Sequence, residues 1–196
     1  MFIETTSESA AEGALAEWYG SQRTSWGFLP DYAGCFSSRP DVAHAWSRLN
    51  LTIRGGMDRR RFEIVTIAAA RALRSTYCTV AHAKFLRDAC GDLETVRSLA
   101  LDPDGSGLSE QDAAVYAFAT KVAQDASRIQ QVDIDALRTV GLSDADVADV
   151  VFAVAARAFF AKVLDALGAR LDTATADTLE PDLLQAMIVG NPVGSR

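Results

Sequence analysis

The sequence predicts an all-α fold, and three observations support this prediction. Apolar residues recur at helical spacing, as at Val42, Trp46, Leu49 and Ile53, which fall at i, i+4, i+7 and i+11. Capping residues and glycines divide the chain into helix-length segments. No segment sustains the apolar–polar alternation of a half-buried strand. With 196 residues, of which 49% are apolar, the chain is long enough to bury a core.

Three helices are expected in the first half of the chain, each bounded by residues typical of helix ends. Asp58 and Ser75 are good N-cap residues, and the glycines at 55, 56 and 91 favour helix C-termini. The expected ranges are 40–56, 58–74 and about 75–89.

Two capping boxes mark helix starts in the second half. Ser109 with Asp112, and Ser143 with Asp146, each place an acidic residue three positions after a serine. The loop LDPDGSG precedes the first of these helices, and the second extends to about Gly168.

An internal similarity links two of the expected helices. A shift of 86 residues lays segment 62–73 over segment 148–159, so that Arg71 and its neighbouring alanines match Arg157 and its neighbouring alanines. The similarity is either a coincidence between two alanine-rich helices or the trace of a duplicated helical unit.

Composition and charge exclude several classes of protein. The net charge of -7 argues against binding to nucleic acid or to an anionic membrane. The longest apolar run, 150–156, is ended by Arg157 and is far shorter than the ~18 residues of a membrane helix. The N-terminus has no basic region before an apolar core, and three cysteines are too few for a disulfide framework, so a cytoplasmic location is expected.

Cys78 and His82 form the first candidate for chemistry. They are four residues apart, so on a helix they share one face. With Ser75 as N-cap, Cys78 occupies the third helical position, where the free backbone amides and the helix dipole favour an anion. A thiol there, beside an imidazole that accepts its proton, has the features of an activated nucleophile. The alternative is a pair of helix residues without a chemical role.

Glu63 is the second candidate. It lies in an otherwise apolar helix, where a carboxylate is either at the solvent edge or buried with a partner.

Together these residues resemble the core of the alkylhydroperoxidase D / carboxymuconolactone decarboxylase superfamily. That motif has a glutamate, a cysteine twelve positions later, a second cysteine after three more and a histidine after four; the matching residues are Glu63, Ser75, Cys78 and His82. The resemblance covers roughly residues 26–170 and is closest to the peroxidase-related branch. It rests further on three flanking segments: FLPDYAGCFSSRPDVAHAW, LSEQDAAVYAFATKVA and 141–168. It implies an all-helical fold with an internal repeat and a homo-oligomer.

The resemblance also implies roles for these side chains. Cys78 would attack a small-molecule hydroperoxide, His82 would be the base that maintains the thiolate, and Glu63 would orient the proton relay. Tyr77, where some members have another histidine, would donate a hydrogen bond. No cofactor and no metal are expected.

The resolving position is occupied by Ser75, whose hydroxyl cannot form a disulfide. On one continuous helix Cys90 lies twelve residues beyond Cys78, about 18 Å along the axis, whereas a disulfide needs Cα atoms within ~7 Å. The sequence does not place Cys35. We therefore expect an external thiol or dithiol to reduce oxidised Cys78, with Ser75 as helix cap and polar lining.

Two other functions remain open. A decarboxylase acting on a small lactone acid would use His82 and Glu63 for proton transfer, with Arg71 and Arg74 holding the acid. A non-catalytic oligomeric protein with a degenerate site is also consistent with Ser75.

Three segments are expected along the chain: an N-terminal segment 1–25, a helical domain 26–170 and a C-terminal extension 171–196. The apolar cluster in 181–196 packs either on its own domain or on a neighbouring subunit.

Overall fold

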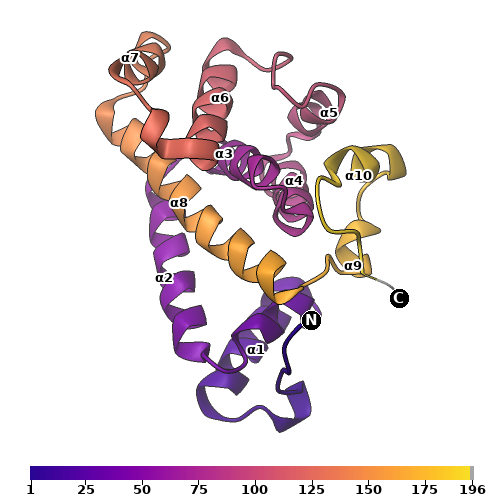
Figure 1. The fold of residues 1–196 in the computed structure, drawn as a ribbon. Coiled ribbons are helices and arrows are strands. Elements are labelled where there is room, and N and C mark those ends of the chain that lie inside the picture. The colour runs from indigo at the N-terminus through magenta and orange to yellow at the C-terminus, as the bar shows by residue number, and fades with distance from the viewer. Residues whose placement is uncertain (195–196) are drawn as a thin grey trace.

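The computed structural model describes residues 1–194 and confirms the all-α prediction. Within this range the only β-type contact is an isolated bridge between Leu171 and Val193. The helices are arranged around a central pair, α3 and α4 (Figure 1). The helical elements, including the 3₁₀ turns η1 to η3, are η1 Glu8–Ala10, α1 Gly13–Trp26, η2 Asp31–Phe36, α2 Pro40–Gly56, α3 Arg59–Ala72, α4 Thr76–Cys90, α5 Leu93–Leu101, α6 Glu110–Asp125, η3 Ala126–Arg128, α7 Gln131–Thr139, α8 Asp144–Leu167, α9 Thr173–Ala176 and α10 Pro181–Met187.

Helix α3 forms the centre of the core. All residues from 62 to 70 are buried, because α3 packs against α4, α6 and α8. A helix that is apolar on every side is expected to be covered on every side. Glu63 lies within this stretch, so its carboxylate must find partners inside the protein.

Most of the expected helix boundaries are confirmed, and several of them by their caps; Ser109 accepts from the amide of Asp112 without completing the expected capping box. The side chain of Asp58 accepts a hydrogen bond from the amide of Arg61, and Ser143 and Asp146 form a complete capping box. Helices α4 and α8 end at left-handed glycines, Gly91 and Gly168. Helix α2 runs from Pro40 to Gly56, as expected.

The two similar segments lie in α3 and α8, and these two helices pack against each other. The similarity therefore relates two neighbouring core helices.

All three segments expected along the chain contribute to one core, which includes Trp18 of α1 and Met187 of α10. Helix α10 contacts α4 and α5, so the apolar cluster of the tail packs on its own domain. Beyond α10, the amides of Val189 and Gly190 donate to the hydroxyl oxygen of Thr76 at the start of α4. The tail thus braces the helix start that carries Cys78.

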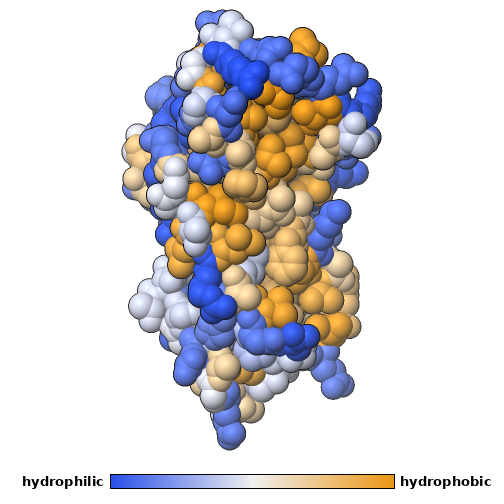
Figure 2. Space-filling model, turned by 90° about the vertical axis from the view of Figure 1, so that its left-hand side faces the viewer, coloured by the Kyte–Doolittle hydropathy of each residue, from blue (hydrophilic) through white to orange (hydrophobic). Residues whose placement is uncertain are grey.

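One face of the molecule is apolar. Figure 2 shows apolar side chains gathered along the side formed by α2 and α8. Leu49 and Phe152 are each 54% exposed and Phe159 is 41% exposed. Within residues 1–194, no helix combines the length and apolarity that crossing a bilayer requires.

Candidate active site

Cys78 lies at the third residue of α4, as expected, and its side chain borders a cavity of about 380 Å³. Helices α1, α2, α3, α4 and α8 all contribute to the cavity wall. Much of this wall is aromatic, formed by Trp26, Tyr32, Trp46, Phe62, Tyr77, Phe85 and Phe160. Cys78 is only 1% exposed, so its sulfur is withdrawn from bulk water.

Glu63 and His82 meet in the wall of the same cavity. Glu63 on α3 is fully buried, and its Oε2 lies 2.5 Å from Nδ1 of His82 on α4. Its other oxygen accepts a hydrogen bond of 2.6 Å from Nε of Arg59, one helical turn earlier on α3. The buried carboxylate is therefore paired on both oxygens, and a position at the solvent edge is excluded.

Charge and burial set the ionisation of this pair. Burial by itself raises the pKa of Glu63, but His82 and Arg59 outweigh it and the net pKa is lowered. Burial, together with the charge of Arg157, lowers the pKa of His82 to about 4. At neutral pH the pair is an ionised carboxylate and a neutral imidazole, whose Nδ1–H donates to Glu63. Nε2 then carries a free lone pair, as a proton acceptor requires.

Arg157 on α8 is a site residue that the sequence analysis did not select. It is 3% exposed, and its Nη1 lies 3.7 Å from the sulfur of Cys78. Its guanidinium also lies over the rings of Trp46 and Phe160, at 6.0 and 5.5 Å from the ring centres. Two sequence signals could have found it: Arg157 ends the longest apolar run, and it matches Arg71 in the internal similarity.

Ser75 and Tyr77 depart from their expected roles. Ser75 is the N-cap residue of α4, but its buried hydroxyl caps no amide and does not line the cavity. The residues that line this cavity therefore do not include Ser75, whose hydroxyl was expected to be part of the polar lining. Tyr77 lines the cavity, but its hydroxyl donates to Asp172, and burial raises its pKa well above the usual value. Its hydrogen bond is thus made away from Cys78.

The other cysteines lie outside the cavity wall. Cys35 is buried in η2, where burial raises its pKa to about 12. Cys90 is at the far end of the continuous helix α4, as the sequence analysis assumed. All three cysteines are free. Among residues 1–194 no group of three or more His, Cys, Asp or Glu side chains is arranged to hold a metal ion.

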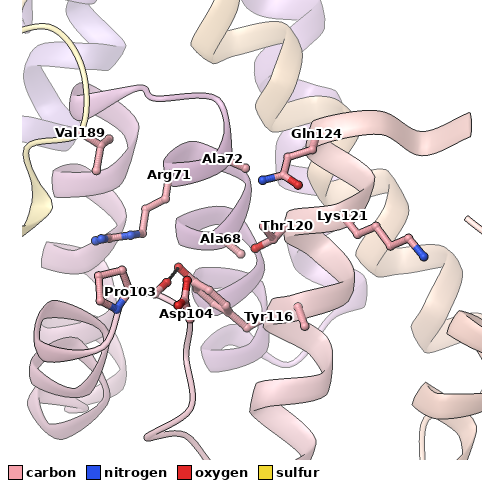
Figure 3. Close-up of a pocket in the computed structure, with 11 residues that line it drawn as sticks. Ala68, Arg71, Ala72, Pro103, Asp104, Tyr116, Thr120, Lys121, Gln124 and Val189 are labelled. Atoms are coloured by element: carbon pink, nitrogen blue, oxygen red, sulfur yellow. Dashed lines mark hydrogen bonds between the residues drawn. The ribbon is translucent and has the colours of Figure 1, made fainter. Parts of the chain in front are cut away.

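Arg71 and Arg74 do not face Cys78. Arg71 lines a different cavity, of about 440 Å³, with Tyr116 and Thr120 of α6 (Figure 3). Its Nη1 lies 3.2 Å from the sulfur of Met187. Nε of Arg74 donates to the carbonyl of Val189. The expectation that these arginines hold an acid beside His82 is therefore not met.

The fold and the site define a helical protein with a buried cysteine at a helix start, beside a glutamate–histidine pair. Residues 40–102, which contain Glu63, Cys78 and His82, match the model of the carboxymuconolactone decarboxylase family. Among curated proteins none matches the sequence significantly.

Solved structures share the fold. An uncharacterised peroxidase-related protein from Ralstonia eutropha JMP134, described as an alkylhydroperoxidase AhpD core, superposes with a TM-score of 0.77 at 20% identity, over 97% of both chains. A peroxidase-related protein from Silicibacter sp. TM1040 gives 0.70 at 18% identity, over 79% of this chain and 82% of its own. A cysteine-to-alanine variant of the debrominase Bmp8, in complex with 2,3,4-tribromopyrrole, gives 0.76 at 17% identity, over 93% of this chain and 97% of its own. The family model thus confirms the predicted resemblance for residues 40–102, and the solved structures confirm the predicted alkylhydroperoxidase D-like fold.

Proposed function

We propose that the protein is a thiol-dependent hydroperoxide reductase in which Cys78 is the peroxidatic nucleophile. The observation that carries the proposal is the placement of Cys78 at a helix start, in a cavity that it shares with the Glu63–His82 pair. Free amides and the helix dipole at that position favour an anionic sulfur.

The reaction has two stages. The sulfur of Cys78 attacks one peroxide oxygen, so an S–O bond forms and the O–O bond breaks. The thiol releases its proton through Nε2 of His82, and the leaving oxygen takes up one proton, so that the products are an alcohol and a sulfenic acid. Glu63 holds the imidazole in the tautomer that this transfer needs.

Reduction of the sulfenic acid uses thiols from outside the site. One external thiol displaces water to form a mixed disulfide with Cys78, and a second thiol releases the cysteine. Ser75 cannot take the first role, and Cys90 is too far along α4.

The test is the consumption of an organic hydroperoxide in the presence of excess dithiol. Wild type and Cys90→Ser should turn over, whereas Cys78→Ser should not. Equal rates in wild type and Cys78→Ser, or no turnover with any of several thiols and dithiols, would reject the proposal. A Cys78 that is also inert to alkylating reagents would favour the non-catalytic alternative. Activity on a lactone acid that survives Cys78→Ala but not His82→Ala would favour the decarboxylase.

A second candidate is the thiol-dependent removal of bromide from an aromatic ring. It is favoured by the aromatic wall around a single cysteine and by the likeness to a debrominase bound to tribromopyrrole. Bromide release from 2,3,4-tribromopyrrole with excess dithiol tests it directly. Peroxide turnover without bromide release would exclude this candidate.

A further inference from the structure

Arg157 is a buried cation whose charge is not matched by a carboxylate. Within residues 1–194 it makes no ion pair with an acidic side chain, and its Nε has no hydrogen-bond partner. By contrast, Arg59, Arg60 and Arg61 on α3 each pair with a carboxylate. A guanidinium withdrawn from water without an anion is strongly disfavoured, and the rings of Trp46 and Phe160 offset only part of that penalty.

The sulfur of Cys78 is the group beside Arg157 that is best placed to become that anion. The carboxylate of Glu63 is committed to Arg59 and His82. The phenols of Tyr32 and Tyr77 are committed to Gln22 and Asp172, and burial raises the pKa of each. The thiol of Cys78, whose sulfur lies 3.7 Å from Nη1 of Arg157, is not hydrogen-bonded to a carboxylate or an amide oxygen.

His82 does not provide a counter-charge for the thiolate. With its pKa lowered to about 4, its imidazole is neutral at physiological pH. An imidazole of this kind accepts a proton transiently during a reaction but does not remain an imidazolium beside a resting thiolate. A permanently charged group is required for that purpose, and a guanidinium is one.

We propose that Arg157 is a catalytic residue whose guanidinium pairs with the ionised sulfur of Cys78 and so maintains the nucleophile. This inference deepens the proposed function, since it concerns the same cysteine. In this proposal Arg157 on α8 provides the permanent positive charge beside the sulfur, and His82 accepts the proton that the thiol releases.

The chain offers a matched control for this proposal. Arg71 occupies the equivalent position in the internal similarity, on α3, but lines the other cavity, where its guanidinium contacts the thioether of Met187. Arg71→Gln therefore removes the same charge from the matching position of the neighbouring helix without touching Cys78.

The test measures alkylation of Cys78 by iodoacetamide at pH 7, with the label assigned by mass spectrometry. Arg157→Gln should react about tenfold more slowly than wild type, since a unit charge ~4 Å from the sulfur is removed. Arg157→Lys should retain most of the rate, and Arg71→Gln should match wild type. Unchanged alkylation in Arg157→Gln would overturn the proposal, as would equal slowing in Arg157→Lys or in Arg71→Gln.

A second measurement needs no arginine variant, which matters if Arg157→Gln folds poorly. The thiolate ultraviolet absorbance of wild type minus that of Cys78→Ser should be present at pH 7. Its absence would overturn the proposal. Neither measurement uses peroxide, so a protein that passes both but turns over no peroxide would refute the proposed function and leave this pairing intact.

Discussion

His82 is expected to make the folded protein sensitive to acid. Burial, reinforced by the charge of Arg157, lowers the pKa of His82 from 6.5 to about 4 in the folded chain. Between these two pH values the unfolded chain binds a proton on His82 and the folded chain does not. The resulting stabilisation is present above pH 6.5 and is lost as the pH falls toward 4. It corresponds to about 3 kcal/mol in total, of which about 2.5 kcal/mol disappears between pH 7.5 and 4.5.

Urea unfolding followed by tryptophan fluorescence at these two pH values measures the effect. Glutamine does not titrate, so His82→Gln should lose about 2.5 kcal/mol less stability than wild type between pH 7.5 and 4.5. The second of the two histidines, His44, supplies the control. It is half-buried outside the cavity, where it contacts the carbonyl of Ala14 and the ring of Trp18, and His44→Gln should follow wild type. Carboxylates other than Glu63 contribute equally to all three proteins, and in His82→Gln the carboxylate of Glu63 keeps its hydrogen bond from Arg59. Equal losses in wild type and His82→Gln would refute the reasoning.

Three further changes test the packing around the site. Met187→Ala should lower the free energy of unfolding by about 3 kcal/mol, because this side chain, at the end of α10, is fully buried; a change below about 1 kcal/mol would contradict its role in holding the tail on the domain. Gly190→Ala should destabilise by about 1–3 kcal/mol in urea unfolding, since a Cβ would come within 1.8 Å of the carbonyl oxygen of Arg74, whereas Gly55→Ala, with nothing within 4 Å, should not destabilise. Equal stabilities of the two alanine variants would argue against that close approach. The expected homo-oligomer is predicted to use the apolar face of α2 and α8, so Phe152→Lys should reduce the mass in solution; an unchanged oligomer would place the interface elsewhere.

The helix boundaries were predictable because they are determined by residues close to each helix end. The Asp58 cap and the Ser143 capping box depend on residues within one helical turn, and Gly91 and Gly168 stop helices through their own backbone conformation. The joint position of Cys78 and His82 was predictable for the same reason, since one turn of helix separates them.

The features of the site that the sequence did not predict depend on contacts between segments that are distant in the chain. Arg157 reaches Cys78 across 79 positions of sequence, and only the packing of α8 on the centre of the fold brings them together. The burial of Glu63 likewise depends on three helices that cover α3. The bracing of the α4 start by Val189 and Gly190 spans more than a hundred positions. No helical periodicity carries such information.

The central claim is that Cys78 is the cysteine that reacts with a hydroperoxide. The most direct measurement exposes the protein to one equivalent of cumene hydroperoxide, traps sulfenic acid with dimedone and locates the adduct by peptide mass spectrometry. The account predicts an adduct on Cys78, about tenfold or more above that on Cys90, although Cys90 is the more exposed thiol. An adduct confined to Cys90 or Cys35, or equal labelling of Cys78 with and without peroxide, would contradict it.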